Sequence, residues 1–508
     1  MAKNNTCGIC NRKGKRACPA LEGMICPACC GASRGSKLEC PPECEHFPFG
    51  TEAYDLWLRI DGTWFPKAVE YVVKHVGEPR FREIIEKVGT STRPKRDDEI
   101  EAGILNAVHY GLSVETDDEG RTLGERWEAE GWTGLNNDER LMTLHRRHTR
   151  PTIIEVQEIL SERASECTDL LDPARGKFLV FDRATAQRSV RFSRYLLWLT
   201  DYPHFSRTAG SGMEIPSHLY EEYFEELLFD DANEDAPKAF QVVKRDLAER
   251  FAEYCDLQVD FAHDYRERAL RSMDLKSCRA SYELLVPRAT IEAIINNKPD
   301  FEVNEGRELE PADPPGSVYF EWLRRGEAKQ FEDSMPAAFQ HDNPQDGVGI
   351  LGALRLHDDG FLVETLGEKK FEFAKALVTR YFGSHVKLTG EESTDLAEQL
   401  LDRDGTESED APSASTPDGP PHPELPHDDM QELMKQVLRN HYQKFMDEPV
   451  PMIDNLTPRQ AAADPEMRPR LIELMKLHIH GVEERARDEN LAFDLDWVVK
   501  ELGLTELQ

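Results

Sequence analysis

This 508-residue sequence lacks long apolar runs and has few basic residues relative to its acidic ones. No apolar stretch approaches the roughly 18 residues of a membrane-spanning helix, and none follows the first residues as in a secretory signal. Asp and Glu number 96 against 62 Lys and Arg, which gives a net charge of −34. A surface of this sign repels nucleic-acid phosphate and anionic membranes. We therefore expect a soluble cytoplasmic protein with no membrane association, in which any nucleic-acid contact is local.

The short motifs of common catalytic sites are also missing, because no GxSxG, P-loop or HExxH pattern occurs. Residues 347–352 fit GxGxxG, but a loop precedes them and an alternating run split by residues 358–360 follows. That context predicts a β-hairpin, not a dinucleotide site. We assign no catalytic residue and favour a non-enzymatic protein. An enzyme whose site forms within residues 91–390 only in three dimensions is the alternative.

Cysteine is scarce beyond residue 44, where only Cys167, Cys255 and Cys278 occur. We interpret these three as small buried apolar residues. The other eight cysteines fall in two CxxC pairs, a CxxxC pair and two further positions. They are Cys7, Cys10, Cys18, Cys26, Cys29, Cys30, Cys40 and Cys44. A reducing cytoplasm disfavours disulfides, and the spacing matches neither common ferredoxin pattern, so the cluster predicts metal binding.

Eight thiolates suit two Zn²⁺ ions with four sulfur ligands each, which is a structural site without an open coordination position. The favoured pairing is Cys7, Cys10, Cys26 and Cys29 on one ion and Cys18, Cys30, Cys40 and Cys44 on the other. His46 is an alternative ligand in the second set. The region contains few large apolar residues, so we expect bound metal to stabilise its fold.

Residues 1–46 are locally basic, with seven Lys and Arg against four Glu. One interpretation is a small docking face for nucleic acid or for an acidic partner. The simpler interpretation, which we favour, is that these cations offset the charge of the thiolates.

The length suggests three or four domains at about 150 residues each, and composition divides the chain further. We expect an α+β multidomain protein with a zinc-stapled module, mixed helical and small antiparallel β middle domains, an acidic linker and a helical end. The predicted segments are a cysteine module at 1–50, a mostly helical segment at 51–150, a small β-sheet or barrel at 151–215, a helical segment with some strand at 216–345, a ββα unit at 346–390, a disordered acidic linker at 391–429 and a helical unit at 430–508.

Individual residues add detail to this plan. The sequence Gly77-Glu78-Pro79 predicts a break between two helices, and Pro66 is expected in the first turn of the earlier one. His145 is expected to be exposed in a basic patch, and His480 is expected on a helix surface.

The linker and the C-terminal unit differ sharply in composition. Residues 391–429 hold 13 Asp and Glu against one Arg, which is typical of a disordered segment. Thr457, Pro458 and Gln460 then form a helix start with an N-cap and a capping-box residue. An apolar stripe follows at Leu471, Leu474, Met475 and Leu477. It either packs within a small helical unit or serves as a partner-binding surface.

Two segments resemble known bacterial proteins. Residues 445–476, FMDEPVPMIDNLTPRQAAADPEMRPRLIELMK, are similar to the toxin-binding tail of Xre/MbcA/ParS-type antitoxins, with Phe445 and Asn455 in place of the usual Trp and Gly. Residues 18–44, CPALEGMICPACCGASRGSKLECPPEC, resemble an N-terminal module of large uncharacterised multidomain proteins. The resemblance implies a bacterial, zinc-binding, multidomain protein. It does not imply an antitoxin, because no helix-turn-helix is recognisable.

These observations favour a zinc-binding adaptor or regulatory interaction protein that binds a protein partner through residues 430–486. A nucleic-acid-associated regulator that uses the basic module at 1–46 is the second hypothesis. Neither the partner's identity nor the oligomeric state follows from the sequence.

Overall fold

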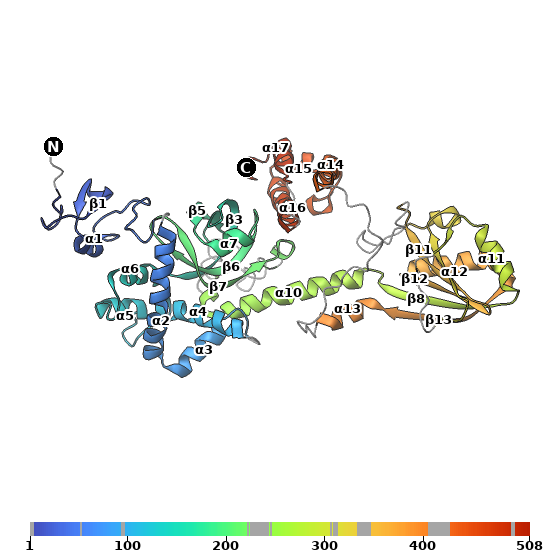
Figure 1. Ribbon diagram of the computed structural model, residues 1–508, viewed down its shortest axis with the longest axis horizontal. Coiled ribbons are helices and arrows are strands. Elements are labelled where there is room, and N and C mark those ends of the chain that lie inside the picture. Colours follow the sequence, from blue (N-terminus) through green and yellow to red (C-terminus); the bar gives the residue numbers. More distant parts are fainter. Residues whose placement is uncertain are drawn as a thin grey trace. The chain divides into compact units, whose positions relative to one another are not determined.

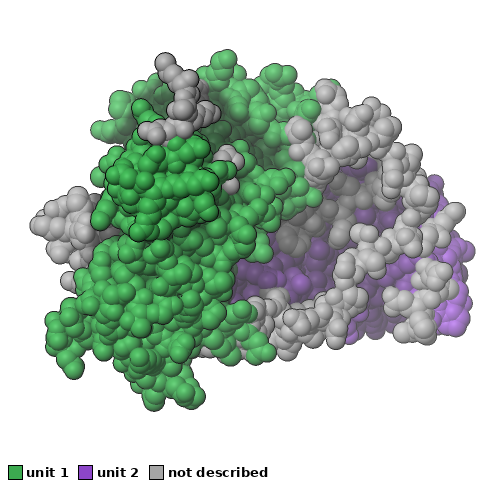
Figure 2. All heavy atoms as spheres, turned by 60° about the vertical axis from the view of Figure 1, so that its left-hand side comes forward, with its two compact units in different colours: residues 1–262, 423–508 green, residues 263–422 purple. Residues whose placement is uncertain are grey.

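The computed structural model describes most of the chain, and the structural statements below concern those residues. They are residues 5–50, 53–92, 97–220, 223, 243, 246–304, 307, 313–332, 347–404, 427–488 and 493–507. The chain divides into two compact units, unit 1 with residues 1–262 and 423–508 and unit 2 with residues 263–422 (Figure 2). Both mix helices with β-sheet, in agreement with the expected α+β class. Among the described residues, no helix combines the length and apolarity needed to cross a membrane.

The cysteine-rich N-terminus folds into a two-stranded hairpin and a short helix. β1 (Arg16–Cys18) pairs antiparallel with β2 (Gly23–Ile25), and α1 (Pro27–Ser33) follows. Pro27 takes the first helical position, where its missing N–H costs no hydrogen bond. Apart from Ile25, the buried residues of this small core are cysteines. The module therefore has little apolar area with which to stabilise itself.

Helices form the next layer of unit 1, as the sequence predicts. They are α2 (Tyr54–Val76), α3 (Glu78–Val88), α4 (Asp97–Ser113), α5 (Leu123–Ala129) and α6 (Asn137–Arg146). The predicted break falls at Gly77, whose φ of 82° suits glycine. The expectation for Pro66 is wrong, because it lies inside α2 and not in its first turn. The buried stripe of this helix already begins at Tyr54 and Trp57, so the helix starts earlier than the proline suggests.

Residues 150–215 form a closed five-stranded barrel where the sequence predicts a small β-sheet or barrel. Its strands are β3 (Arg150–Ser161), β4 (Ala164–Asp169), β5 (Lys177–Val180), β6 (Arg194–Asp201) and β7 (Ser206–Ile215). They close in the order β3-β4-β5-β7-β6, with β5 and β7 parallel, and α7 (Arg183–Arg188) lies between β5 and β6. This arrangement is that of an OB-fold barrel. Such a fold does not by itself assign a ligand.

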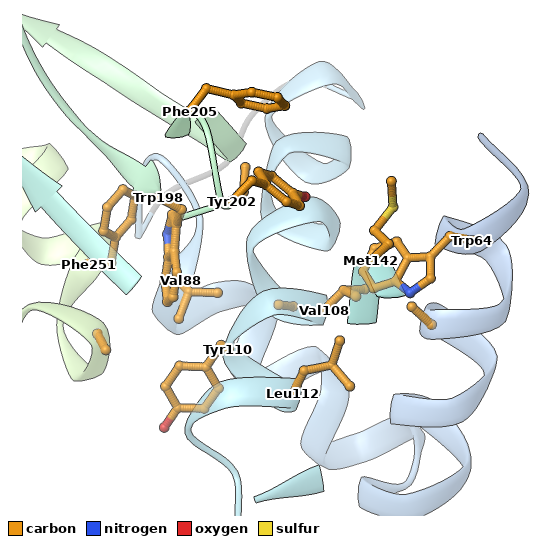
Figure 3. Close-up of a cluster of buried hydrophobic side chains, with 14 of the residues drawn as sticks. Trp64, Val88, Val108, Tyr110, Leu112, Met142, Trp198, Tyr202, Phe205 and Phe251 are labelled. Carbon is orange, nitrogen blue, oxygen red and sulfur yellow. The ribbon is translucent and has the colours of Figure 1, made fainter. Parts of the chain in front are cut away.

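The helical layer and the barrel share one hydrophobic core. Trp64 and Met142 from the helices lie opposite Trp198 and Tyr202, which come from β6 and the turn that follows it (Figure 3). Arg146 is buried with them, its guanidinium 4.3 Å from the centre of the Trp64 ring, and its Nε donates to the Tyr202 hydroxyl. We therefore expect the helices and the barrel to fold as one body.

Unit 2 is built on a six-stranded antiparallel sheet with the order β13-β8-β12-β11-β10-β9 (Figure 1). The strands are β8 (Lys276–Leu284), β9 (Phe301–Val303), β10 (Val318–Leu323), β11 (Ile350–Leu356), β12 (Gly360–Leu366) and β13 (Val386–Asp395). The helices of this region are α10 (Phe251–Ser272), which contains the boundary between the units, α11 (Arg288–Asn296), α12 (Glu368–Phe382) and α13 (Leu396–Asp404). β11 and β12 form the hairpin that the sequence predicts in place of a dinucleotide site.

Two predicted boundaries in this region are wrong. β8 and β10 belong to the same sheet as β11 and β12, so residues 216–345 and 346–390 do not form separate domains. The linker predicted at 391–429 begins too early, because the second half of β13 and all of α13 occupy its first part. Every side chain of β13 after Val386 is exposed, so its backbone pairing with β8 leaves no apolar pattern in the sequence. Residues 405–426 of the predicted linker lie outside the described residues.

The end of the chain is helical, as predicted, and belongs to unit 1. Its helices are α14 (His427–Phe445), α15 (Pro458–Ala463), α16 (Arg468–Asp488) and α17 (Asp496–Glu501). We call residues 427–507 the C-terminal unit. Leu471, Leu474 and Met475 are buried in its own core, so these residues of the predicted stripe serve self-packing. Leu477 is half-buried and borders a cavity.

Candidate metal centre

Four cysteines converge at the N-terminus. The sulfur atoms of Cys7, Cys10, Cys26 and Cys29 all lie within 4.8 Å of one another, and the sulfurs of Cys10 and Cys26 are 3.7 Å apart. Cys7 and Cys26 are buried, whereas Cys10 is exposed. These are the four cysteines that the two CxxC pairs assign to a single ion. The arrangement can hold a metal ion with four sulfur ligands.

The local backbone conformation turns the sulfurs of both CxxC pairs toward one another. The first pair lies in a tight turn, where the Cys7 N–H donates to the Arg12 carbonyl and the Asn11 N–H donates to the Cys7 carbonyl. In the second pair, Cys26 is the N-cap of α1, and its sulfur accepts a hydrogen bond of 3.4 Å from the Cys29 N–H. Backbone N–H groups directed at sulfur stabilise thiolates, the form that binds metal.

The acidities of these thiols differ strongly. Hydrogen bonding by the backbone amides of Cys26 and Cys10 lowers the pKa of Cys7 to about 6. The sulfurs of Cys10 and Cys26 raise the pKa of Cys29 to about 12. The cluster therefore resists carrying a full set of thiolates on its own, and a bound cation supplies the charge that would stabilise them.

The four cysteines of the second predicted set are also buried, each with at most 9% of its surface exposed. They are Cys18, Cys30, Cys40 and Cys44. Burial raises the pKa of Cys40 above its usual value. Within the part of the chain that the structure describes, however, only the first set has its sulfurs within 4.8 Å. The second ion therefore stays a prediction.

The ring of His46 lies beside the neighbouring carboxylate of Glu45. Its Nε2 lies 3.4 Å from a carboxylate oxygen of Glu45, and the His46 backbone carbonyl accepts a hydrogen bond from Arg34. The Arg34 guanidinium also pairs with Asp138 at the start of α6. The His46 carbonyl thus helps to position Arg34, which joins the module to α6. The His46 ring lies next to an exposed carboxylate.

Two phenylalanines after the last cysteine join the module to the core of unit 1. Phe47 and Phe49 are almost fully buried, and Phe49 stacks on Tyr202 with ring centres 4.7 Å apart. The ring of His204, in the turn between β6 and β7, hydrogen-bonds the Cys40 carbonyl at 2.8 Å. The sequence prediction of a separate module at 1–50 missed this contact, although Phe47-Pro48-Phe49 was a visible apolar signal.

The basic residues that the structure describes in the module divide into two groups. Arg34 is buried in its ion pair with Asp138, and the Arg16 guanidinium lies 3.5 Å from the Cys30 sulfur. Both therefore have structural roles. The exposed basic residues that remain are Arg12, Lys13, Lys15 and Lys37.

The isolated cysteines are buried, as expected. Burial raises the pKa of Cys167 to about 12 and also raises the pKa values of Cys255 and Cys278. These thiols stay protonated at neutral pH, which makes them poor nucleophiles.

The expectations for two histidines are wrong. His145 is not an exposed member of a basic patch, because its ring packs between Phe49 and Tyr202 at centre distances of 5.1 and 5.3 Å. Burial lowers the pKa of His145 to about 4. His480 is not on an open helix surface, since α16 presents it to Ser193 of the barrel. Both lie in tertiary contacts that no local pattern encodes.

Comparison of the chain with family models, with curated proteins and with solved structures gives no match. The site must therefore be interpreted from its own chemistry.

Proposed function

We propose that this protein is a non-enzymatic zinc-binding adaptor, or regulatory interaction protein, in which a metal-stapled module supports a partner-binding C-terminal unit. The observation that carries the proposal is the convergence of Cys7, Cys10, Cys26 and Cys29. Four sulfur ligands saturate a tetrahedral ion and leave no position for substrate, which is typical of a structural zinc site and not of a catalytic one.

A second Zn²⁺ bound by Cys18, Cys30, Cys40 and Cys44 completes the proposed module. The near-complete burial of these sulfurs supports it, because buried thiolates need a compensating cation. The Arg16 guanidinium beside Cys30 supplies further positive charge. Binding of the ion requires the four sulfurs to draw closer together than they lie here.

Residues 430–486 are the proposed partner-binding region. Their likeness to the toxin-binding tail of Xre/MbcA/ParS-type antitoxins supports this assignment, without implying a toxin as the partner. The half-buried Leu477 and the exposed His441 border a cavity of about 430 Å³, which supports an open apolar surface beside the packed core.

A pull-down of the tagged full chain from native lysate, with and without nuclease, tests the proposal. We expect one protein in near-equal amount, and we expect it to be lost when residues 430–486 are deleted. The variant Cys26→Ser/Cys29→Ser should lose one of the two proposed zinc ions, whereas Cys278→Ser, which changes a buried cysteine of unit 2, should keep both. A full complement of zinc in the first variant, or recovery of the partner by the deleted chain, would overturn the proposal.

Exposure of Arg12, Lys13, Lys15 and Lys37 favours a second candidate, a nucleic-acid-associated regulator that uses residues 1–46. Four phosphate contacts correspond to a log–log salt dependence with a slope of about −3. Filter binding of labelled RNA and DNA between low and physiological salt measures that slope. Binding that does not respond to salt, or that persists when the four residues are replaced by Ser, would exclude this face.

A further inference from the structure

One loop of the barrel inserts an aromatic side chain into the C-terminal unit. Phe192 lies between α7 and β6 and is only 3% exposed. Its ring belongs to the hydrophobic core that α16 and α17 form with their neighbours, and not to the core of the barrel. The C-terminal unit therefore completes its core with a residue that lies more than 200 positions earlier in the chain.

Charged contacts flank this aromatic residue on both sides. The Arg191 guanidinium donates to Glu483 of α16 at 2.5 Å and to Asp496 of α17 at 2.7 Å, and the Arg191 N–H also donates to Glu483. On the other side, the Arg194 guanidinium donates to Glu473 of α16 at 2.5 Å. The C-terminal unit thus places three carboxylates around the aromatic site, and Glu473 also accepts from Lys476 of the same helix at 2.9 Å. The barrel offers Arg191 of the loop and Arg194 at the start of β6.

A buried network links the barrel to Lys476 of α16. Glu155 of β3 accepts from the Arg194 Nε at 2.7 Å and from the Lys476 ammonium at 2.8 Å. Burial alone would raise the pKa of Glu155, but these two cations outweigh it and hold the pKa below its usual range. The contacts described here are ionic apart from one aromatic anchor, and inter-domain interfaces of this polar kind resemble those of transient complexes.

The loop also carries backbone strain. Phe192 has a φ of +66°, a left-handed value that is costly for a residue with a Cβ. The Phe192 N–H donates to the Val156 carbonyl at 2.7 Å, which helps to hold the loop in this conformation. A cavity of about 730 Å³ opens beside the ring, with Ile159 of the barrel and Val499 and Leu507 of the C-terminal unit among its lining residues. The strained backbone at Phe192 and the cavity beside its ring would together allow the loop to leave the C-terminal unit.

We propose that the face of α16 and α17 that receives Phe192 is the surface that binds the protein partner. The partner presents an aromatic side chain flanked by arginines, the chemistry that residues 191–194 of this chain supply in cis. The inference rests on the proposed function, since it specifies where a partner binds and what that partner offers. The carboxylates of Glu473, Glu483 and Asp496 select a basic segment, and the apolar site between them selects the aromatic ring.

A labelled peptide of residues 186–197 is the probe, and fluorescence anisotropy with the full chain is the measurement. A tethered competitor holds a site at an effective concentration of the order of millimolar, so the wild-type chain should bind the peptide weakly. Phe192→Ala frees the site in cis and should bind the peptide at least tenfold more tightly. A peptide in which Phe192 is replaced by Ala should not bind either chain.

Further variants keep the test decisive if Phe192→Ala unfolds. Arg191→Ala removes the contacts of its guanidinium with Glu483 and Asp496 but leaves the aromatic anchor, and it should also increase peptide binding. Arg175→Ala is the matched control, because Arg175 is equally exposed at 20% and pairs with Asp201 within the barrel. It should bind like the wild type. Equal binding by Arg191→Ala and Arg175→Ala, or no gain in any folded variant, would overturn the inference.

The two proposals fail separately. A partner that is recovered from lysate through residues 430–486, while the peptide does not bind, leaves the adaptor function intact and removes this surface. Peptide binding without any recovered partner would show that the surface accepts an aromatic segment flanked by arginines, and it would remove the adaptor function.

Discussion

At the scale of single residues, spacing alone grouped the four cysteines that the structure brings together, Cys7, Cys10, Cys26 and Cys29. A two-residue spacer turns both sulfurs of a pair to one side, so Cys7 with Cys10 and Cys26 with Cys29 converge without help from distant residues. Cys18, Cys30, Cys40 and Cys44 depend instead on how the hairpin, α1 and the segment before Phe47 pack together. Spacing does not determine that packing.

Single cysteine substitutions should separate the two proposed ions. Cys26→Ser removes a ligand of the first set and should lower bound zinc from two equivalents to about one, and Cys30→Ser should do the same for the second set. The variant that combines Cys26→Ser with Cys30→Ser should bind little zinc, whereas Cys278→Ser should bind as the wild type does. Metal analysis of the purified, reduced proteins measures this. Two equivalents in either single variant would show that the ligand assignment is wrong.

His145 should make the protein sensitive to mild acid. Burial holds its folded-state pKa at about 4, below the value of about 6.5 in an unfolded chain, so the unfolded state takes up the proton first. The stability that the neutral His145 ring contributes is complete above pH 6.5 and is lost as the pH falls toward 4. About 1 kcal/mol should be lost between pH 8 and 5.5. Urea unfolding of wild type and His145→Gln at both values isolates this part. An equal loss of stability in both proteins would contradict the assignment.

At the scale of elements, local chemistry predicted the start of α15 better than it predicted the strands. The Thr457 hydroxyl accepts from the Gln460 N–H, and the Gln460 side chain accepts from the Thr457 N–H, as the capping-box pattern indicates. β13, in contrast, is specified by its backbone pairing with β8, and its exposed acidic side chains resemble those of a linker. The barrel was predictable in its strand content, but its closure depends on pairings between distant strands.

Loss of the cap at α15 should loosen the start of the C-terminal unit. Thr457→Ala leaves the Gln460 N–H without its acceptor and should cost about 1 kcal/mol of local stability. Hydrogen exchange of peptides from α15 and α16 measures the change. Thr457→Ser retains the hydroxyl and should stay within a few tenths of a kcal/mol of the wild type. Similar exchange in the Ala and Ser variants would mean that the cap has no energetic role.

At the scale of the whole molecule, the N-terminal module is part of unit 1 and not an appendage to it. Phe47 and Phe49 enter the core that the helices share with the barrel, and the ring of His204 holds the Cys40 carbonyl. Composition could not reveal this, because the contacts join residues that lie more than 100 positions apart. The C-terminal unit is joined to the barrel in the same way, through Phe192 and the ion pairs around it.

Metal removal should therefore destabilise more than the module. A metal ion that binds only the folded state raises the free energy of unfolding of the whole cooperative body. Its removal should therefore lower the stability of every element that packs against the module. After chelation under reducing conditions, we expect faster hydrogen exchange in β6 and α6 as well as in residues 5–46. The strands of unit 2 serve as an internal control and should not change. Faster exchange confined to residues 5–46 would show that the module is energetically independent.

Native mass spectrometry of the full reduced chain tests the central claim most directly, because it counts bound ions on the folded protein. The account predicts two zinc ions per chain, both removed by chelation, and one ion in Cys26→Ser/Cys29→Ser. A chain that carries no metal, or whose N-terminal cysteines are joined by disulfides, would contradict it.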